Sequence, residues 1–178
     1  YFSARGLHGA PDAPIIIQAA DPGQPPVFRG ASECLHLSNV SYLVLRNLVF
    51  VGARVNGLNI DDGGTITRPS HHLVLDGLRV RDVGPRGNRD GIKLSGVDDF
   101  LMVNCAVERW GSGGSAVDMV GCHRGLIADC RFEKALAIIG PGSSGKSTFL
   151  ESSHTTSAHA GFLTHANSRI LLIVSTLY

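Results

Sequence analysis

Four seven-residue segments share one pattern and decide the fold: Val44-Leu-Arg-Asn-Leu-Val-Phe50, Val74-Leu-Asp-Gly-Leu-Arg-Val80, Leu101-Met-Val-Asn-Cys-Ala-Val107 and Leu126-Ile-Ala-Asp-Cys-Arg-Phe132. Each segment has apolar residues at its first, second, fifth and seventh places, and its fourth place is Asn, Gly or Asp. The segments start at residues 44, 74, 101 and 126, so the interval between them shortens along the chain. A coil whose turns are joined by loops of variable length would show such unequal intervals. A unit that recurs in this way is typical of a solenoid, in which each repeat stacks on the one before it.

A second short strand follows each of the first three segments: Gly57-Leu-Asn-Ile60, Gly91-Ile-Lys-Leu94 and Ala116-Val-Asp-Met119. Apolar residues alternate in these strands with period 2, which predicts that Leu58, Ile92 and Val117 face the interior. Equivalent residues of successive turns would then stack roughly 4.8 Å apart. Asn47 and Asn104 fall where the chain must turn, and Asn tolerates the left-handed conformation of such corners. The apolar run 14–18 predicts one more turn nearer the N-terminus.

These patterns predict an all-β fold, a right-handed single-stranded parallel β-helix of about five turns. The repeats occupy residues 1–132 and are clearest over 14–132, whereas residues 133–178 form an atypical C-terminal segment. A doubly wound α/β fold would need amphipathic helices between the strands, and the intervening Gly- and Pro-containing pieces do not fit helices. A β-sandwich remains an alternative, although only the stacked coil explains the recurring column of residue types.

Charge and hydropathy exclude two classes of partner. Lys plus Arg is 16 and Asp plus Glu is 15, so the formal net charge of +1 is unlike that of a dedicated nucleic-acid binder. No apolar stretch approaches the roughly 18 residues that span a bilayer. The chain begins Tyr-Phe-Ser-Ala-Arg without Met, and we expect either that a leader has been removed or that the sequence starts inside a longer protein. Cys105 and Cys130 occupy the same place in adjacent repeats, which predicts stacked interior thiols.

Three stretches carry a family resemblance: Asn56-Gly-Leu-Asn-Ile-Asp-Asp-Gly-Gly64, Asn88-Arg-Asp-Gly-Ile-Lys-Leu-Ser-Gly96 and Gly113-Gly-Ser-Ala-Val-Asp-Met-Val-Gly121. They resemble the repeats of pectate-lyase-like β-helix proteins, over about residues 10–132. The resemblance implies binding of an acidic polysaccharide, with cleavage by a polysaccharide lyase or glycoside hydrolase mechanism. It also implies an extracellular, periplasmic or cell-surface location. Because this superfamily includes members without known activity, a non-catalytic glycan- or surface-binding β-helix is the alternative.

The second strands suggest where such chemistry would lie. If Leu58, Ile92 and Val117 point inward, the small residues of the same strands point outward and leave a shallow trough, which suits an extended sugar chain. These small residues are Gly57, Gly91 and Ala116. A row of polar side chains then borders the trough, and it consists of Asn59, Lys93 and Asp118. Asp61 and Ser95 lie two residues further along their strands and are predicted to point outward as well.

A lyase interpretation makes Lys93 the proton abstractor or charge stabiliser, oriented by Asn59 and Asp118. Arg86 and Arg89, on the preceding loop, are predicted to pair with substrate carboxylates, because a planar guanidinium matches carboxylate geometry. Asn59 and Asp90 are predicted to bind substrate as well. Uronate lyases often use Ca²⁺, and the oxygens of Asp61, Asp62 and Asp90 suit such a hard cation.

A hydrolase interpretation uses Asp61 and Asp118 instead, since inverting chemistry needs carboxylates roughly 6.5–9.5 Å apart. Asn88-Arg-Asp-Gly91 resembles the Asn-x-Asp-Gly element of pectin-hydrolysing β-helices. The paired-Asp and Gly-His-Gly elements that accompany it in that family are not found in the expected order. The third interpretation is a solvated face, in which Lys93 and Asp118 form a surface ion pair of small energetic value.

The C-terminal segment contains a complete phosphate-loop pattern, Gly140-Pro-Gly-Ser-Ser-Gly-Lys-Ser147. It resembles the phosphate-binding segment of ABC-type transporter ATPases, and Gly140, Gly145, Lys146 and Ser147 would contact nucleotide phosphates. The later apolar run 170–174 ends at Ser175, where a Walker B strand would end in Asp. The segment is therefore interpreted either as a further coil with strands near 161–163 and 170–174, or as a foreign piece joined near Glu133.

Overall fold

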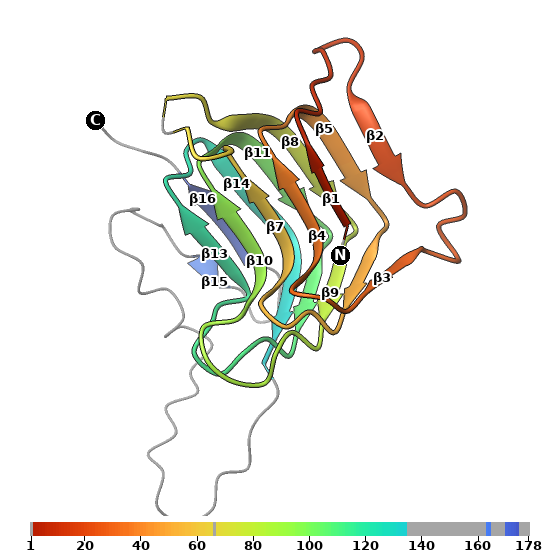
Figure 1. Ribbon diagram of the computed structural model, residues 1–178, viewed down its shortest axis with the longest axis vertical. Helices are drawn as coiled ribbons and strands as arrows, with labels where there is room; N and C mark the ends of the chain where they lie inside the picture. Colours follow the sequence, from red (N-terminus) through yellow and green to blue (C-terminus); the bar gives the residue numbers. More distant parts are fainter. Residues whose placement is uncertain (1, 66, 135–162, 165–169, 175–178) are drawn as a thin grey trace, which may run out of the picture.

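The chain folds into a parallel β-solenoid of about four turns (Figure 1). The computed structural model describes residues 2–65, 67–134, 163–164 and 170–174. These residues form strands and turns, and no helix long and apolar enough to cross a membrane occurs among them. The parallel pairing of strands in successive turns confirms the predicted stacked coil over the alternative of a β-sandwich.

Each full turn contributes one strand to each of three sheet faces. The first face has the order β1(Phe2–Arg5), β4(Glu33–Ser38), β7(Asn56–Asp61), β10(Asp90–Ser95) and β13(Val117–Val120). The second has the order β2(Ile15–Gln18), β5(Ser41–Arg46), β8(Ser70–Asp76), β11(Val97–Val103) and β14(Gly125–Glu133). The third has the order β3(Val27–Arg29), β6(Val49–Val51), β9(Arg79–Arg81) and β12(Ala106–Glu108), and it joins the second through β14.

The register of the second face confirms the alignment of the four repeats. Val44 pairs with Val74, Val74 with Leu101, and Leu101 with Leu126, so the first places of the repeats form one continuous row. The second, fifth and seventh places point into the coil and stack as buried columns, apart from a half-buried Phe132. The buried members are Leu45, Leu75, Met102, Ile127, Leu48, Leu78, Cys105, Cys130, Phe50, Val80 and Val107.

The fourth place of every repeat adopts the left-handed conformation, with φ of 52° at Asn47, 64° at Gly77, 55° at Asn104 and 52° at Asp129. Asn, Asp and Gly adopt this conformation at low cost, which explains why only these residue types occur in the column. The predicted corner role of Asn47 and Asn104 is therefore confirmed.

The predicted outward trough is wrong, because the small residues of the second strands face inward. A Cβ at Gly57 would lie 2.2 Å from Cγ1 of Val80, and a Cβ at Gly91 would lie 2.2 Å from Cγ1 of Val107. Ala116 is also buried, at 7% exposure. Strict alternation fails here because the chain is still rounding a corner as it enters each strand. Gly57 and Leu58 therefore both face the core, as do Gly91 and Ile92, and the period-2 alternation begins only after Leu58 and Ile92.

The C-terminal end of the solenoid differs from the turns before it. β16(Ile170–Val174) pairs antiparallel with β14 and with β15(Leu163–Thr164), so these strands do not continue the parallel coil. The predicted stacking of Cys105 and Cys130 is confirmed, since both are buried free thiols at the same place of adjacent turns, and each donates to backbone carbonyls. The neighbouring Cys130 thiol and burial raise the pKa of the Cys105 thiol. The predicted nucleotide-binding residues 140–147 lie outside the described residues.

Candidate functional site

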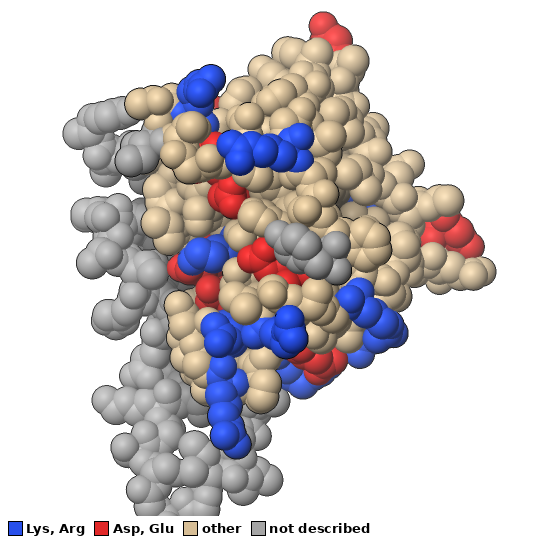
Figure 2. Space-filling model, viewed as in Figure 1, with Lys and Arg blue, Asp and Glu red and all other residues tan. Residues whose placement is uncertain are grey.

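A ladder of polar side chains crosses the outer surface of the first face. His36 of β4 is in register with Asn59 of β7, Asn59 with Lys93 of β10, and Lys93 with Asp118 of β13. These partly buried side chains alternate with the buried Leu58, Ile60, Ile92 and Leu94, so they point away from the core. We call the outer surface of β4, β7, β10 and β13 the ladder face. Figure 2 looks onto it and shows acidic and basic side chains gathered together over the middle of these strands.

Lys93 and Asp118 form an ion pair at the β13 end of the ladder face. Lys93 donates a hydrogen bond from Nζ to Oδ2 of Asp118, and the two side chains are 28% and 14% exposed. The structure therefore brings together two of the three predicted catalytic residues. A lysine that donates to a carboxylate is better placed to stabilise negative charge than to abstract a proton.

Asn59 lies beside Lys93 in the ladder and has one unsatisfied atom. Its Nδ2 donates to Oε1 of Glu33 at 2.8 Å. Its Oδ1 is buried and accepts no hydrogen bond from the described residues. A buried acceptor without a partner costs about 1–3 kcal/mol, and Lys93 has three protons to donate. Lys93 is in register with Asn59 on the adjacent strand, so its ammonium is the nearest charged donor of the ladder to this acceptor.

A second cluster, which the sequence prediction missed, lies at the β4 end of the ladder face. Nε2 of His36 is 2.5 Å from Oδ2 of Asp61, and its Nδ1 is 3.4 Å from Oε2 of Glu33. Ser38 donates from Oγ to Oδ1 of Asp61 at 2.7 Å. The signal was present in the sequence, because Leu35-His-Leu37 alternates in the same way as Leu58-Asn-Ile60. This alternation identifies β4 as the strand that precedes β7 on the ladder face.

Asp61 is held as a carboxylate and leans toward β4. Partial burial raises its pKa, but hydrogen bonds from Ser38, His36 and the Gly63 amide outweigh that effect and lower the pKa overall. Asp61 is in register with Ser95, and Ser95 with Val120, two residues beyond Asp118. Strand spacings then place the Cα atoms of Asp61 and Asp118 about 12 Å apart. With the Asp61 side chain turned toward β4, away from β13, this geometry does not favour an inverting pair.

The carboxylates predicted to bind Ca²⁺ are occupied by protein donors. The amide of Gly63 donates to Asp61 Oδ1 at 2.8 Å, and the amide of Gly64 donates to Asp62 Oδ1 at 2.7 Å. Within the described part of the chain, no three His, Cys, Asp or Glu side chains are grouped so that they could hold a metal ion. The residues present therefore do not fit a Ca²⁺ site built on Asp61 and Asp62.

Asp90, predicted to bind substrate, lies beneath the surface. It is 2% exposed, and its Oδ1 accepts a hydrogen bond from the Ser115 amide at 2.8 Å. Burial raises its pKa, although the Ser115 hydrogen bond acts in the opposite direction. Asp90 is therefore placed to fix the loop that leads into β13, and its carboxylate does not line the ladder face.

Arg86 and Arg89 do come together, on a hollow below the ladder face. They line an open hollow of about 560 Å³ with Arg54 and Asp82, from the loops that precede β7 and β10. We call this the arginine hollow. Figure 2 shows basic side chains gathered at this end of the strands. Arg89 precedes Lys93 by four residues, which corresponds to about 13 Å along an extended strand, so the hollow lies at the rim of the ladder face.

The described chain is thus a parallel β-solenoid with an ion-paired polar face and a basic rim. No protein-family model and no curated protein matches the sequence. Among solved structures, it is similar to an alginate lyase from Paenibacillus sp. str. FPU-7, with 23% identity and a TM-score of 0.48 over 60% of this chain. The matched region is 35% of that lyase. A likeness of this extent does not transfer the lyase's activity to this chain.

Proposed function

We propose that the ladder face binds an extended acidic polysaccharide, with Lys93 as its central cation and Arg86 and Arg89 as partners for carboxylates at its rim. The observation that carries this proposal is the row of His36, Asn59, Lys93 and Asp118, one residue from each of four successive turns. Such a row offers polar groups at a regular spacing of roughly 4.8 Å. It suits a ligand that is itself extended and repetitive better than a compact metabolite.

The positive charge that would attract an acidic ligand lies mainly at the rim of the ladder face. On the face itself Asp118 is paired with Lys93, and Asp61 accepts hydrogen bonds from His36 and Ser38. Arg86 and Arg89 form no ion pair with a carboxylate of the described residues, so their charge would attract the acidic groups of a polysaccharide.

Cleavage by β-elimination is the reaction that this arrangement supports best. In such a reaction the carbon adjacent to the uronate carboxylate loses its proton to a base and negative charge develops on the carboxylate. The glycosidic C–O bond then breaks, a carbon–carbon double bond forms, and the leaving oxygen takes up a proton from water. An ammonium already held by Asp118 and adjacent to Asn59 would stabilise that charge without reorganising. Hydrolysis by Asp61 and Asp118 has less support, because about 12 Å separates their Cα atoms and Asp61 leans away. Simple adhesion to a glycan is the rival function.

Lys93→Met separates these functions, with Arg46→Met as the matched control. Arg46 forms an ion pair with Asp76 at 3.0 Å on a different face, so its replacement removes one positive charge away from the ladder. Affinity for uronate oligosaccharides would be measured by calorimetry, and cleavage by the ultraviolet absorbance of the unsaturated product. A charge-assisted hydrogen bond contributes about 1.5–3 kcal/mol, so we expect Lys93→Met to weaken binding at least about tenfold.

The outcomes of this experiment are distinct. A lyase would form unsaturated product, and Lys93→Met would abolish it while Arg46→Met left it unchanged. An adhesin would bind without forming product. Unchanged affinity in Lys93→Met would overturn the proposed face. A parallel series with EDTA tests the predicted calcium requirement, and since Asp61 and Asp62 do not fit a site, we expect chelation to leave the affinity unchanged. An extracytoplasmic location is part of this proposal.

A further inference from the structure

The arginine hollow contains positive charge that no carboxylate of the described residues pairs with. Arg54, Arg86 and Arg89 line it, and none of them forms an ion pair with a carboxylate among the described residues. Arg89 donates a hydrogen bond from Nη1 to the Asn88 carbonyl, at 3.3 Å, which leaves its charge unpaired with any carboxylate of the described residues.

The one carboxylate that lines the hollow is already balanced. Asp82 accepts hydrogen bonds from Nε of Arg109 at 2.6 Å and from Nη2 at 3.3 Å. The hydrogen bonding and charge of Arg109 lower the pKa of Asp82, against a smaller effect of burial. Asp82 therefore stays ionised and paired with a guanidinium that does not line the hollow, which leaves Arg54, Arg86 and Arg89 available to an anion.

The walls of the hollow fix the backbone at Arg54 and the side-chain stem of Arg89. The Gly84 amide donates to the Ala53 carbonyl at 2.9 Å, and the Arg54 amide donates to the Ala31 carbonyl at 2.9 Å, so three successive turns are joined here. A Cβ at Gly84 would lie 2.8 Å from the Arg54 carbonyl oxygen and 3.1 Å from Cγ of Arg89. The stem of Arg89 thus packs into space that only glycine leaves open. Pre-ordered side chains lose little entropy when they bind a ligand.

We propose that the arginine hollow is a binding subsite for an anionic group of the polysaccharide, a carboxylate or a sulfate ester, and that Arg54 is its third guanidinium. The inference rests on the proposed function, since it assigns the hollow to the ligand that lies over Lys93. Guanidinium groups bind such planar or tetrahedral oxyanions through paired hydrogen bonds. An extended chain places the Cα atoms of Arg89 and Lys93 about 13 Å apart, so we expect more than one sugar unit to be needed to bridge the two sites. The subsite would then select polyanionic chains over single acidic sugars.

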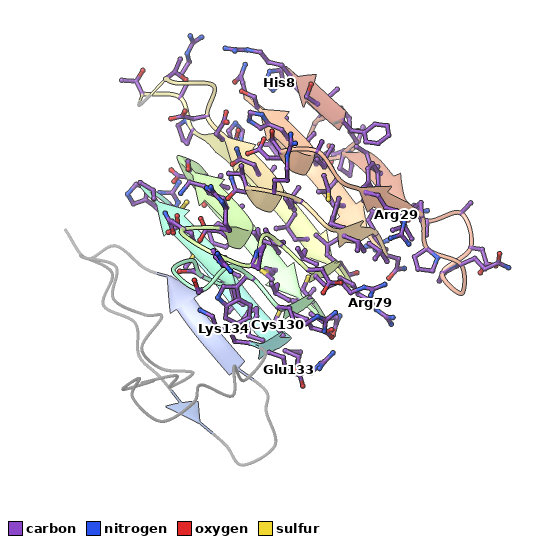
Figure 3. The ribbon with its side chains drawn as sticks, turned by 60° about the horizontal axis from the view of Figure 1, so that its bottom comes forward. His8, Arg29, Arg79, Cys130, Glu133 and Lys134 are labelled. Atoms are coloured by element: carbon purple, nitrogen blue, oxygen red, sulfur yellow. The ribbon has the colours of Figure 1, made fainter. Side chains whose placement is uncertain are left out.

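Arg54→Met tests the subsite, with Arg79→Met as the matched control. Arg79 is exposed on β9, does not line the hollow and lies along the third face between Arg29 and Glu133 (Figure 3). Calorimetric affinities would be compared for a long uronate oligomer, a uronate disaccharide, a sulfated oligomer and a neutral oligomer. We expect Arg54→Met to weaken binding of the long acidic oligomer about tenfold. Binding of the disaccharide should change less than about twofold, and Arg79→Met should bind both like the wild type.

Each result bears on one conclusion. If wild type binds the long uronate and the sulfated oligomer equally, the hollow recognises the oxyanion, and a preference for one of them identifies its source. If the wild type binds acidic oligomers but Arg54→Met binds them as tightly as Arg79→Met, the subsite is refuted while the proposed function stands. If the wild type binds the neutral oligomer as tightly as the acidic ones, or binds none of them, the proposed function fails and the subsite fails with it.

Discussion

Gly91 offers a sharp test of how the strands of the ladder face enter the solenoid. In the structure a Cβ at Gly91 would lie 2.2 Å from Cγ1 of Val107 and 2.6 Å from the carbonyl oxygen of Ala116. That carbonyl accepts a hydrogen bond from the Ile92 amide at 2.9 Å, so it cannot retreat without weakening the sheet. Gly91→Ala should therefore destabilise the protein, since neither neighbour has room to move.

The expected magnitude follows from the two neighbours. Overpacking a core costs about 1–3 kcal/mol, and the strained backbone hydrogen bond adds about 0.5–1.5 kcal/mol. The free energy of unfolding should fall by about 1.5–4.5 kcal/mol in total. Gly91 is not among the residues with positive φ. An outward-facing Gly91 would therefore predict the opposite sign, because Gly→Ala at a compatible position stabilises a protein by about 0.4–1 kcal/mol.

Urea denaturation followed by tryptophan fluorescence would measure this change. The chain has a single tryptophan, and Trp110 is 6% exposed in the core. Ala116→Gly serves as the control in the next turn, because it removes the one Cβ that this column accommodates and should cost only about 0.5–1 kcal/mol. A Gly91→Ala protein as stable as the wild type, or more stable, would refute the inward orientation and restore the outward trough.

Two further predictions concern carboxylates whose pKa values shift in opposite directions. The pKa of Asp61 is lowered in the folded protein, so the stability that Asp61 contributes is present above the unfolded pKa of about 3.9 and is lost as the pH falls through the folded pKa. Thermal denaturation at a series of acidic pH values should therefore show a fall in melting temperature that Asp61→Asn removes. If the melting temperature of Asp61→Asn fell with pH as steeply as that of the wild type, the cluster with His36 and Ser38 would be contradicted. The pKa of Asp90 is raised by burial, so its contribution is full below about 3.9 and is lost as the pH rises through the folded value. Asp90→Asn keeps an acceptor for the Ser115 amide and should raise the melting temperature at neutral pH but not at acidic pH, whereas a lower melting temperature at neutral pH would show that the charge itself is needed.

The solenoid was predictable from the sequence because stacking imposes a column of equivalent residue types. The fourth place of the repeat illustrates this, since Asn47, Gly77, Asn104 and Asp129 all adopt a positive φ. A backbone requirement that recurs in every turn limits the residue types at that place, and the limit is visible in one sequence. The outward ladder from Asn59 through Lys93 to Asp118 follows from the same register.

The remaining features of the site depend on geometry that recurs less regularly. The inward orientation of Gly57 and Gly91 comes from the corner before each strand, where alternation is suspended, and no periodic pattern reports it. His36 was missed because its turn precedes the first clear repeat. Arg54 was missed for a different reason, since the loops that carry Arg54 and Arg89 differ in length and no alignment of repeats brings them together.

The ladder face and the arginine hollow would contribute differently to ligand specificity. The ladder face is tied to the repeat, so its residues can change type but hardly change position. The arginine hollow is built by loops between β6 and β7 and between β9 and β10, and loops tolerate insertion and substitution without loss of the scaffold. If both bind one polysaccharide, the ladder sets the direction of the chain across successive turns, and the hollow sets which charge pattern the chain must carry. Replacing Arg54 should therefore change which oligomers are preferred, whereas replacing Lys93 should weaken the binding of all acidic oligomers alike.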